Sequence, residues 1–279
     1  MKKVYDWIYC NRLVGNVVAF IYYLLIVLPH EQVGLAVVYL FKAKSRAFYQ
    51  NTMMISGVLL LVILMAYLLP KIIKHPYRNR ILMGLTVTLV LMMASFKLLL
   101  VHNVEIIHFA QYFSLCFFIY PLVKNLNRTF IISTLAGFFD ELYQYLILAP
   151  ERTDYFDFND IFLNELGAAL GVLFLFSIGF STINRPKWYH TSEFFVFAAI
   201  FLSLVLMYCI GEFSYFMPTD GTSPIFVLIK KEYPGFFTVI SHLNVRFHVL
   251  KPLPGSLLIT CTAIFYILLF GTERKKSDA

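Results

Sequence analysis

The chain has 279 residues, of which 59% are hydrophobic and only 14% are charged, and its mean hydropathy is +0.73. One soluble core could not bury that much apolar surface, so the composition excludes a soluble domain and predicts an integral membrane protein. The net charge of +7 then reflects membrane topology and attraction to an anionic inner leaflet, and we expect no nucleic-acid partner.

Eight apolar stretches are about long enough to cross a hydrocarbon core. They predict an all-α fold, a polytopic transmembrane helical bundle of about eight spans. The first stretch is not followed by a small-residue cleavage site, so we expect a retained helix rather than a signal peptide. In chain order the predicted spans are Leu13 to Leu28, Met53 to Leu69, Ile81 to Val101, Ile106 to Val123, Phe130 to Leu148, Ile161 to Ile178, Phe194 to Ile210 and Ser256 to Phe270.

Two further segments are predicted to lie at the membrane surfaces. The apolar piece from Val33 to Phe41 is too short to cross, so we expect an interfacial helix. The segment 211–254 is rich in aromatic residues and turn formers, and because bare loop backbone is not stable in lipid, we expect it to cap the outer face. Lys and Arg are more numerous on the side of the two termini, which predicts that both termini are cytoplasmic.

Asp140 and Glu141 stand side by side inside the fifth predicted span. Each would cost about 2.5 to 3.5 kcal/mol if it were ionised at the centre of a bilayer, so the pair must be protonated, partnered or hydrated. Gln144 follows one helical turn later. This pair is therefore where we look for function first.

Three motifs follow one another across consecutive predicted spans. They read E-x-x-H-F-x-x-Y (Glu105, His108, Tyr112), D-E-x-x-Q (Asp140, Glu141, Gln144) and, after Arg152, D-x-x-x-N-x-x-G-x-x-x-G (Asp160, Asn164, Gly167, Gly171). In this order they resemble the VanZ-like family of membrane proteins, which is named for a member associated with teicoplanin resistance. The resemblance covers about residues 105 to 171. It implies a multi-pass protein of the bacterial cell membrane with a role in the cell envelope.

Two departures from the family pattern matter. Glu105 stands where the family often has Lys, and the connection that precedes Asp160 is longer than usual. Asp157 therefore competes with Asp160 as the family's acid, and the spacing of four residues to Asn164 favours Asp160. We expect three regions: N-terminal helices with the interfacial helix (1–104), a VanZ-like core (105–180), and C-terminal helices with the large outer loop (181–279).

The polar pairs of the three motifs lie one helical turn apart. With the predicted topology, all of them fall between mid-membrane and the outer surface, where they would form one pocket that opens away from the cytoplasm. Candidate catalytic residues are His108, Asp140 and Glu141. Candidate ligand-binding residues are Glu105, His108, Tyr112, Asp140, Glu141, Gln144, Arg152, Asp160 and Asn164.

Several of these residues also have a structural interpretation. Asp160 is alternatively the N-cap of the sixth span, accepting from the amide of Leu163, and Arg152 is alternatively a surface ion-pair partner. Gly167 and Gly171 have the spacing of close helix packing. His108 and the acids are metal-ligand types, yet no H-E-x-x-H occurs on one helix. The sequence therefore predicts neither a metal nor another cofactor, and the four cysteines, far apart, predict no disulfide.

Three function classes remain open. The first is a non-catalytic envelope protein that binds an amphiphile at the outer leaflet, either a lipid-linked wall precursor or a lipid-tailed glycopeptide. The second is an intramembrane enzyme that acts on a lipid head group, and the third is a proton-coupled carrier. The expected partner in each case is a membrane lipid or a lipid-linked amphiphile, and the sequence does not fix an oligomeric state.

Overall fold

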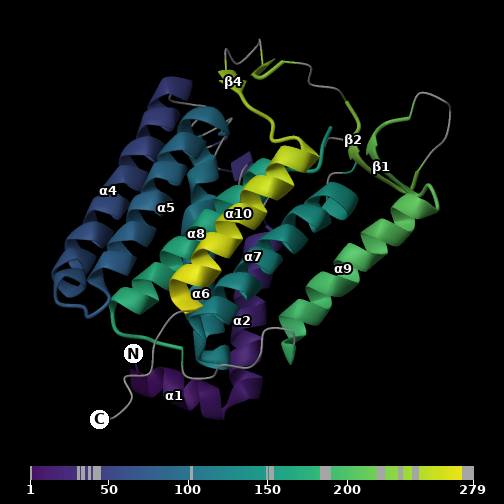
Figure 1. The fold of residues 1–279 in the computed structure, drawn as a ribbon. Helices are drawn as coiled ribbons and strands as arrows, with labels where there is room; N and C mark the ends of the chain where they lie inside the picture. Colours follow the sequence, from purple (N-terminus) through teal and green to yellow (C-terminus); the bar gives the residue numbers. More distant parts are fainter. Residues whose placement is uncertain are drawn as a thin grey trace.

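A computed structural model gives the fold of the chain (Figure 1). The structure describes residues 2–29, 32, 35–36, 39, 45–100, 103–148, 150, 154–182, 190–218, 224–231, 235–240 and 245–271. The predicted interfacial helix from Val33 to Phe41 lies mostly outside the described residues, and so does Arg152.

Each of the eight predicted spans is a helix, which confirms a helical multi-pass membrane protein. Among the described residues, five helices are long and apolar enough to cross a membrane: α4, α5, α8, α9 and α10. The pair α1 and α2, bent by 105° between Cys10 and Arg12, gives a sixth if it is counted as one span. The helices are α1 (Lys2–Cys10), α2 (Arg12–Val27), α4 (Arg46–Ile73), α5 (Arg78–Leu98), α6 (Ile107–Val123), α7 (Leu126–Tyr143), α8 (Phe158–Ser177), α9 (Ser192–Cys209) and α10 (Pro252–Gly271).

Helix α8 is the central element of the bundle. It packs against α4, α5, α6, α7 and α10, and nearly all of its residues are buried. Its small residues let neighbouring backbones approach closely: a Cβ added at Gly167 would lie 2.7 Å from the Phe109 carbonyl oxygen, and one at Gly171 would lie 2.6 Å from that of Phe113. The close-packing interpretation of these two glycines is therefore confirmed.

Helices α4 and α9 lie on opposite sides of the bundle (Figure 1). Only 6% of the most apolar window of each is buried within the protein. Their exposed side chains are mostly large and apolar, as in Val58, Leu59, Phe201 and Leu202. Such surfaces are those expected of helices that border lipid.

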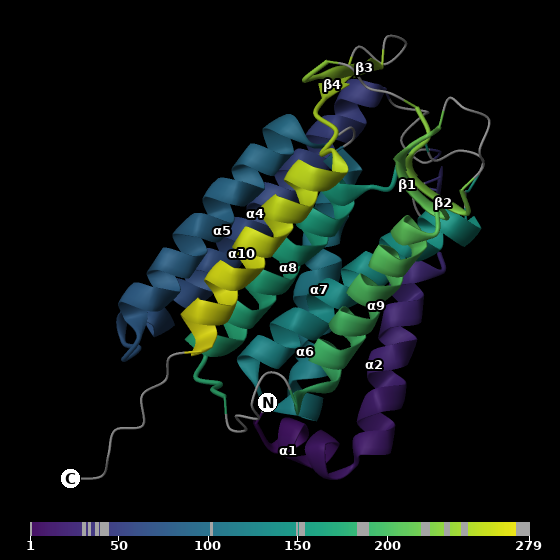
Figure 2. The ribbon, with the colours of Figure 1, turned by 45° about the vertical axis from the view of Figure 1, so that its right-hand side comes forward.

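The described part of the segment 211–251 lies at one end of the bundle, opposite α1 (Figures 1 and 2). It contains two small sheets: β1 (Phe213–Phe216) pairs in parallel with β2 (Phe226–Ile229), and β3 (Thr238–Ile240) pairs antiparallel with β4 (Val245–Phe247). Asn159 attaches it to the bundle, because its Nδ2 donates to the His248 carbonyl oxygen at 2.8 Å and its Oδ1 accepts from the Leu250 amide at 2.9 Å. The segment thus covers the ends of α7 and α8.

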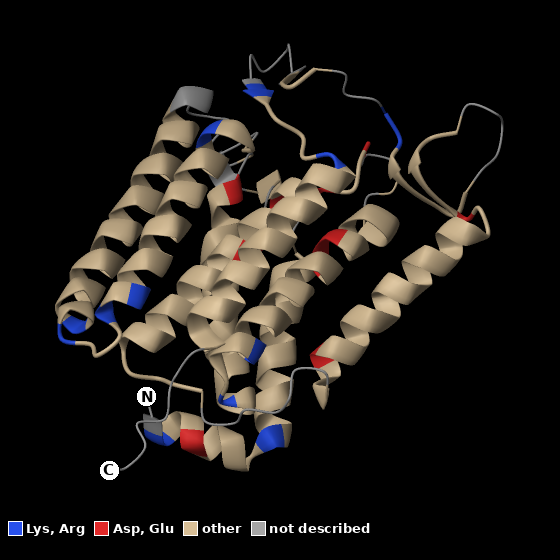
Figure 3. Cartoon of the chain, in the orientation of Figure 1, with Lys and Arg blue, Asp and Glu red and all other residues tan. Residues whose placement is uncertain are grey.

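The turn between α4 and α5 and the turn between α6 and α7 lie at the same end as α1 (Figure 3). These turns carry the basic residues Lys71, Lys74, Arg78, Lys124 and Arg128. Helix α10 also finishes at this end, where Gly271 lies close to Asn127 at the start of α7. The first and last described helices therefore share the basic end of the bundle.

Candidate functional site

Helix ends bring the predicted polar residues together. His108 lies in the first turn of α6, Asp140 and Glu141 lie in the last turn of α7, and Asp160 and Asn164 lie in the first two turns of α8. These three ends are at the end of the bundle that the segment 211–251 covers. Gly137 permits the approach of α7 to α8, since an added Cβ there would lie 2.7 Å from the Asn164 Cβ.

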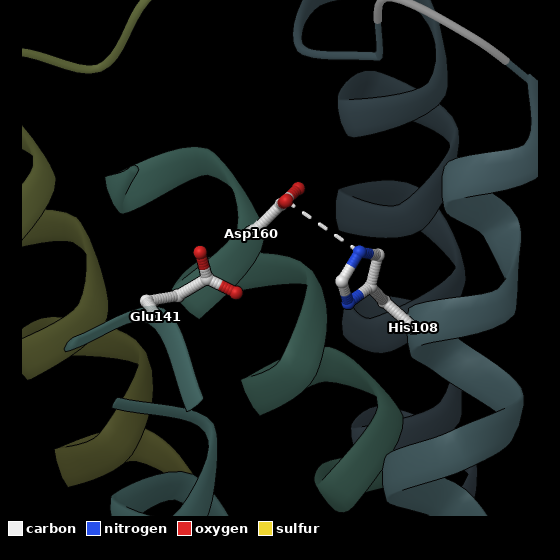
Figure 4. A group of neighbouring side chains, drawn as sticks. All are labelled: His108, Glu141 and Asp160. Atoms are coloured by element: carbon white, nitrogen blue, oxygen red, sulfur yellow. Dashed lines mark ion pairs between the residues drawn. The ribbon is translucent and has the colours of Figure 1, made fainter. Parts of the chain in front are cut away.

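His108 contacts two residues of α8, Asn164 and Asp160, and Figure 4 shows its ion pair with Asp160. Its Nδ1 lies 2.9 Å from Asn164 Oδ1, and its Nε2 lies 3.5 Å from Asp160 Oδ2. The side chain of His108 is only 2% exposed, whereas that of Asp160 is 18% exposed. The imidazole is therefore fixed in orientation and directs Nε2 toward the carboxylates.

Asp140 and Glu141 share a donor from the next turn. After Tyr143 the helix widens into one π-helical turn, Gln144–Leu148. The backbone N–H of Gln144 donates to the backbone carbonyl oxygens of both acids. The Gln144 side chain donates to Asp140 Oδ1 at 3.1 Å and to Glu141 Oε1 at 3.3 Å. Tyr112 Oη donates to Asp140 Oδ2 at 3.0 Å. Single π-turns of this kind are frequent at functional sites.

These contacts form two groups, which meet where Glu141 approaches His108 and Asp160, and we call the seven residues together the polar cluster. Asp140 is fully buried and Glu141 is 3% exposed, so the cluster is more closed than the predicted pocket, and only Asp160 and Gln144 are partly exposed. Ligand atoms of His108, Glu141 and Asp160 all lie within 4.8 Å of one another. The members of the polar cluster are His108, Tyr112, Asp140, Glu141, Gln144, Asp160 and Asn164.

Asp157, not Asp160, is the N-cap of α8. Its carboxylate accepts from the amides of Asn159 at 2.9 Å and of Asp160 at 3.3 Å, so the N-cap interpretation of Asp160 is wrong. Burial and the charge of Asp160 raise the pKa of Asp157 to about 7, although the two cap bonds act against the shift. Glu105 lies in a short 3-10 turn before α6 and is not joined to the polar cluster by the contacts above.

Sequence reasoning missed Glu165. It is fully buried in α8, and within the described residues neither of its carboxylate oxygens has a hydrogen-bond partner. Glu165 directly follows Asn164 in α8, so the two side chains leave the helix about 100° apart, and none of the hydrogen bonds above joins Glu165 to the polar cluster. The rule that singled out Asp140 and Glu141, an acid inside an apolar stretch, would also have found it.

An apolar groove lies beside the polar cluster. Its volume is about 390 Å³, and at one end Arg128 forms an ion pair with Glu193. At the other end Tyr23 Oη donates to the Ala136 carbonyl oxygen at 3.0 Å, and Ala136 precedes Asp140 by one helical turn. The groove runs between α2, α6, α7 and the start of α9, and its apolar lining is Ala19, Leu115, Ile119, Leu122, Val123, Ile132 and Ala136.

A family model described as VanZ/LLP1 matches residues 2–180. The chain belongs to this family. The match runs from α1 to the end of α8, so it contains the whole polar cluster and extends well beyond the motifs in residues 105 to 171. No curated protein and no solved structure matches the chain. Membership of the VanZ/LLP1 family supports a multi-pass membrane protein and leaves the ligand and the reaction to be inferred from the site.

Proposed function

We propose that this VanZ-family protein binds an amphiphile at the outer side of the bacterial cell membrane and thereby contributes to resistance against lipid-tailed glycopeptides such as teicoplanin. The ligand is either the glycopeptide itself or a lipid-linked wall precursor. The observation that carries the proposal is the position of the apolar groove one helical turn from the polar cluster. The cluster would contact the polar head of the ligand, and the groove would hold its acyl tail.

The proposal includes an orientation of the protein. With eight spans and both termini in the cytoplasm, the basic end of the bundle faces inward, as the positive-inside rule requires. The polar cluster and the segment 211–251 then face outward (Figure 3). Cysteine substitutions at two exposed positions, Lys74 in the turn between α4 and α5 and Ile225 in the segment 211–251, test this orientation: position 74 should be labelled from the inside and position 225 from the outside.

Survival assays test the resistance role. Expression of the chain should protect cells against teicoplanin more than against vancomycin, and Glu141→Gln should abolish that difference. Glu165→Gln is the matched control, since Glu165 is an equally buried acid outside the polar cluster. Equal protection by the wild type and Glu141→Gln at equal expression would refute the proposal.

The groove gives a second test that uses purified protein. Ala136→Leu adds three carbons to the groove lining next to Tyr23, so an acylated glycopeptide should bind more weakly while its deacylated form is little affected. Ala199→Leu on the exposed face of α9 is the control. A lipid-linked wall precursor measured in parallel distinguishes the two ligand sources. If Ala136→Leu weakens the binding of neither ligand, the assignment of the groove is contradicted.

One observation favours a second candidate, an intramembrane enzyme acting on a lipid head group. His108 is fixed by Asn164 and lies 3.5 Å from the Asp160 carboxylate, an arrangement suited to general acid-base catalysis. Incubation of purified protein with labelled polyprenyl and glycerolipid substrates tests it, and turnover that is lost in His108→Ala would favour it over binding alone. A proton-coupled carrier would instead show pH-dependent flux in liposomes.

A further inference from the structure

We propose that His108, Glu141 and Asp160 bind one transition-metal dication, Zn²⁺ or Mn²⁺, at the outer edge of the polar cluster. The three side chains come from three helices, α6, α7 and α8, and converge on one point (Figure 4). One imidazole nitrogen and two carboxylate oxygens form a mixed nitrogen and oxygen set that suits these ions. The partial exposure of Asp160, at 18%, leaves one side of the site open to a further ligand.

The distances fit a site that needs only small side-chain adjustments. Ligands at about 2.0 to 2.2 Å from a tetrahedral metal lie roughly 3.3 to 3.6 Å from one another. His108 Nε2 and Asp160 Oδ2 are already 3.5 Å apart, and the separations to Glu141 do not exceed 4.8 Å. Rotation of the flexible Glu141 side chain closes the remaining gap.

The hydrogen bond of His108 gives an independent reason for a cation at this point. Asn164 Oδ1 can only accept, so His108 Nδ1 donates to it across 2.9 Å. A neutral imidazole then presents the lone pair of Nε2 to the Asp160 carboxylate, which repels it. Either a proton or a metal ion must lie between them, and the nearby oxygen of Glu141 favours the metal.

The residues around these three ligands resemble an outer coordination shell. In metal sites the second nitrogen of a ligating histidine is usually bound to a protein acceptor, and ligating carboxylates accept further hydrogen bonds. Asn164 fills the first role, and Gln144, which donates to Glu141 at 3.3 Å, fills the second. A pattern search on one helix could not reveal this set, because each ligand comes from a different helix.

The inference rests on the proposed function only in that both use the polar cluster. A dication would change the net charge of a cluster that contains several acids, and would let it receive an anionic group of the amphiphile. Metal binding is nevertheless measured without any amphiphile, so the two proposals succeed or fail separately.

The test uses the full chain in detergent, purified without a histidine tag and stripped with EDTA. Titration with Zn²⁺ alone and with Mn²⁺ alone, by calorimetry and by elemental analysis after desalting, should give one ion per chain. Glu141→Gln and Asp160→Asn should each weaken binding at least about 10-fold, and His108→Ala should do the same. Glu165→Gln, an isosteric change on α8 outside the cluster, should bind as the wild type does.

A second readout separates metal binding from folding. The metal should raise the melting temperature of the wild type, because a ligand that binds only the folded state stabilises it, and it should not raise that of Glu141→Gln. The inference would be overturned if the wild type showed no saturable metal binding, or if Glu141→Gln and Asp160→Asn bound the metal as tightly as the wild type does. His108 and Asp160 would then be interpreted as an imidazolium–carboxylate pair. Metal binding without amphiphile binding would instead refute the proposed function alone.

Discussion

Gly167→Ala tests whether the contact between α6 and α8 builds the polar cluster. The added Cβ would lie 2.7 Å from the Phe109 carbonyl oxygen and 3.0 Å from the Phe109 Cα, whereas ordinary contact begins near 3.4 Å, so α6 must retreat by about 0.7 Å. Overpacking of this kind costs about 1 to 3 kcal/mol, and the clash with backbone places it at the upper end. Because alanine is about 1 kcal/mol more favourable than glycine inside a helix, the net loss in the free energy of unfolding is about 2 kcal/mol.

The same retreat should damage the site. The bond between His108 Nδ1 and Asn164 Oδ1 is 2.9 Å long, and a shift of about 0.7 Å takes it beyond the usual limit of about 3.2 Å. Thermal unfolding in detergent should therefore show a melting temperature several degrees lower, together with weaker Zn²⁺ binding. Gly57→Ala is the control, because its Cβ would meet only the terminal carbons of Ile106, at 3.2 Å and 3.6 Å. Equal stability of Gly167→Ala and Gly57→Ala would refute the reasoning.

Three further changes have defined outcomes. Asn159→Ala removes the bonds to His248 and Leu250 and should expose the segment 211–251 to proteolysis while the helical content, measured by circular dichroism, is retained. Glu165→Leu removes a buried acid without a partner in the described structure and should leave stability equal or raise it by about 1 to 3 kcal/mol, measured by thermal unfolding; a large loss would indicate an essential role. Because the pKa of Asp157 is raised from 3.8 to about 7, the unfolded chain releases this proton first, and stability should fall as the pH rises from about 4 to 7. Asp157→Asn keeps a capping side chain and should flatten that dependence. Asp157→Ala should flatten it as well and should be about 1 kcal/mol less stable than Asp157→Asn at every pH, because it also loses the cap; equal slopes in the wild type and Asp157→Asn would contradict the assignment.

The helices were predictable because their apolar stretches are long. The eight predicted spans match α2 and α4 to α10 within a few residues at most ends. Helix α1 was not predicted, since its nine residues mix apolar and charged side chains and its position depends on packing against α6. The strands β1 to β4 were also missed, because strands of three or four residues are fixed by tertiary contacts rather than by their own sequence pattern.

The polar cluster was predictable in membership but not in its pairings. Motif spacing placed His108, Asp140 and Asp160 on neighbouring helices, and the structure brings them together. Spacing could not show that Asp157 rather than Asp160 caps α8, because both stand within one turn of the helix start and only backbone geometry distinguishes them. Asn159 was missed for a related reason: its partners, His248 and Leu250, lie about 90 residues away in the chain.

The three buried acids of α7 and α8 differ in how well the protein satisfies them. Within the described residues, Asp140 accepts from Tyr112 and Gln144, Glu141 accepts only from Gln144, at 3.3 Å, and Glu165 accepts from none. For Asp140, two hydrogen-bond donors offset the cost of burying the carboxylate, and the carboxylate in turn orients those donors. For Glu141, one long hydrogen bond offsets only part of the burial cost. Because Glu141 also lies beside His108 and Asp160, a positively charged ligand would stabilise it most. For this reason Glu141→Gln is the most informative single substitution in the protein, because it keeps the shape of the side chain and removes only the charge that a ligand would neutralise.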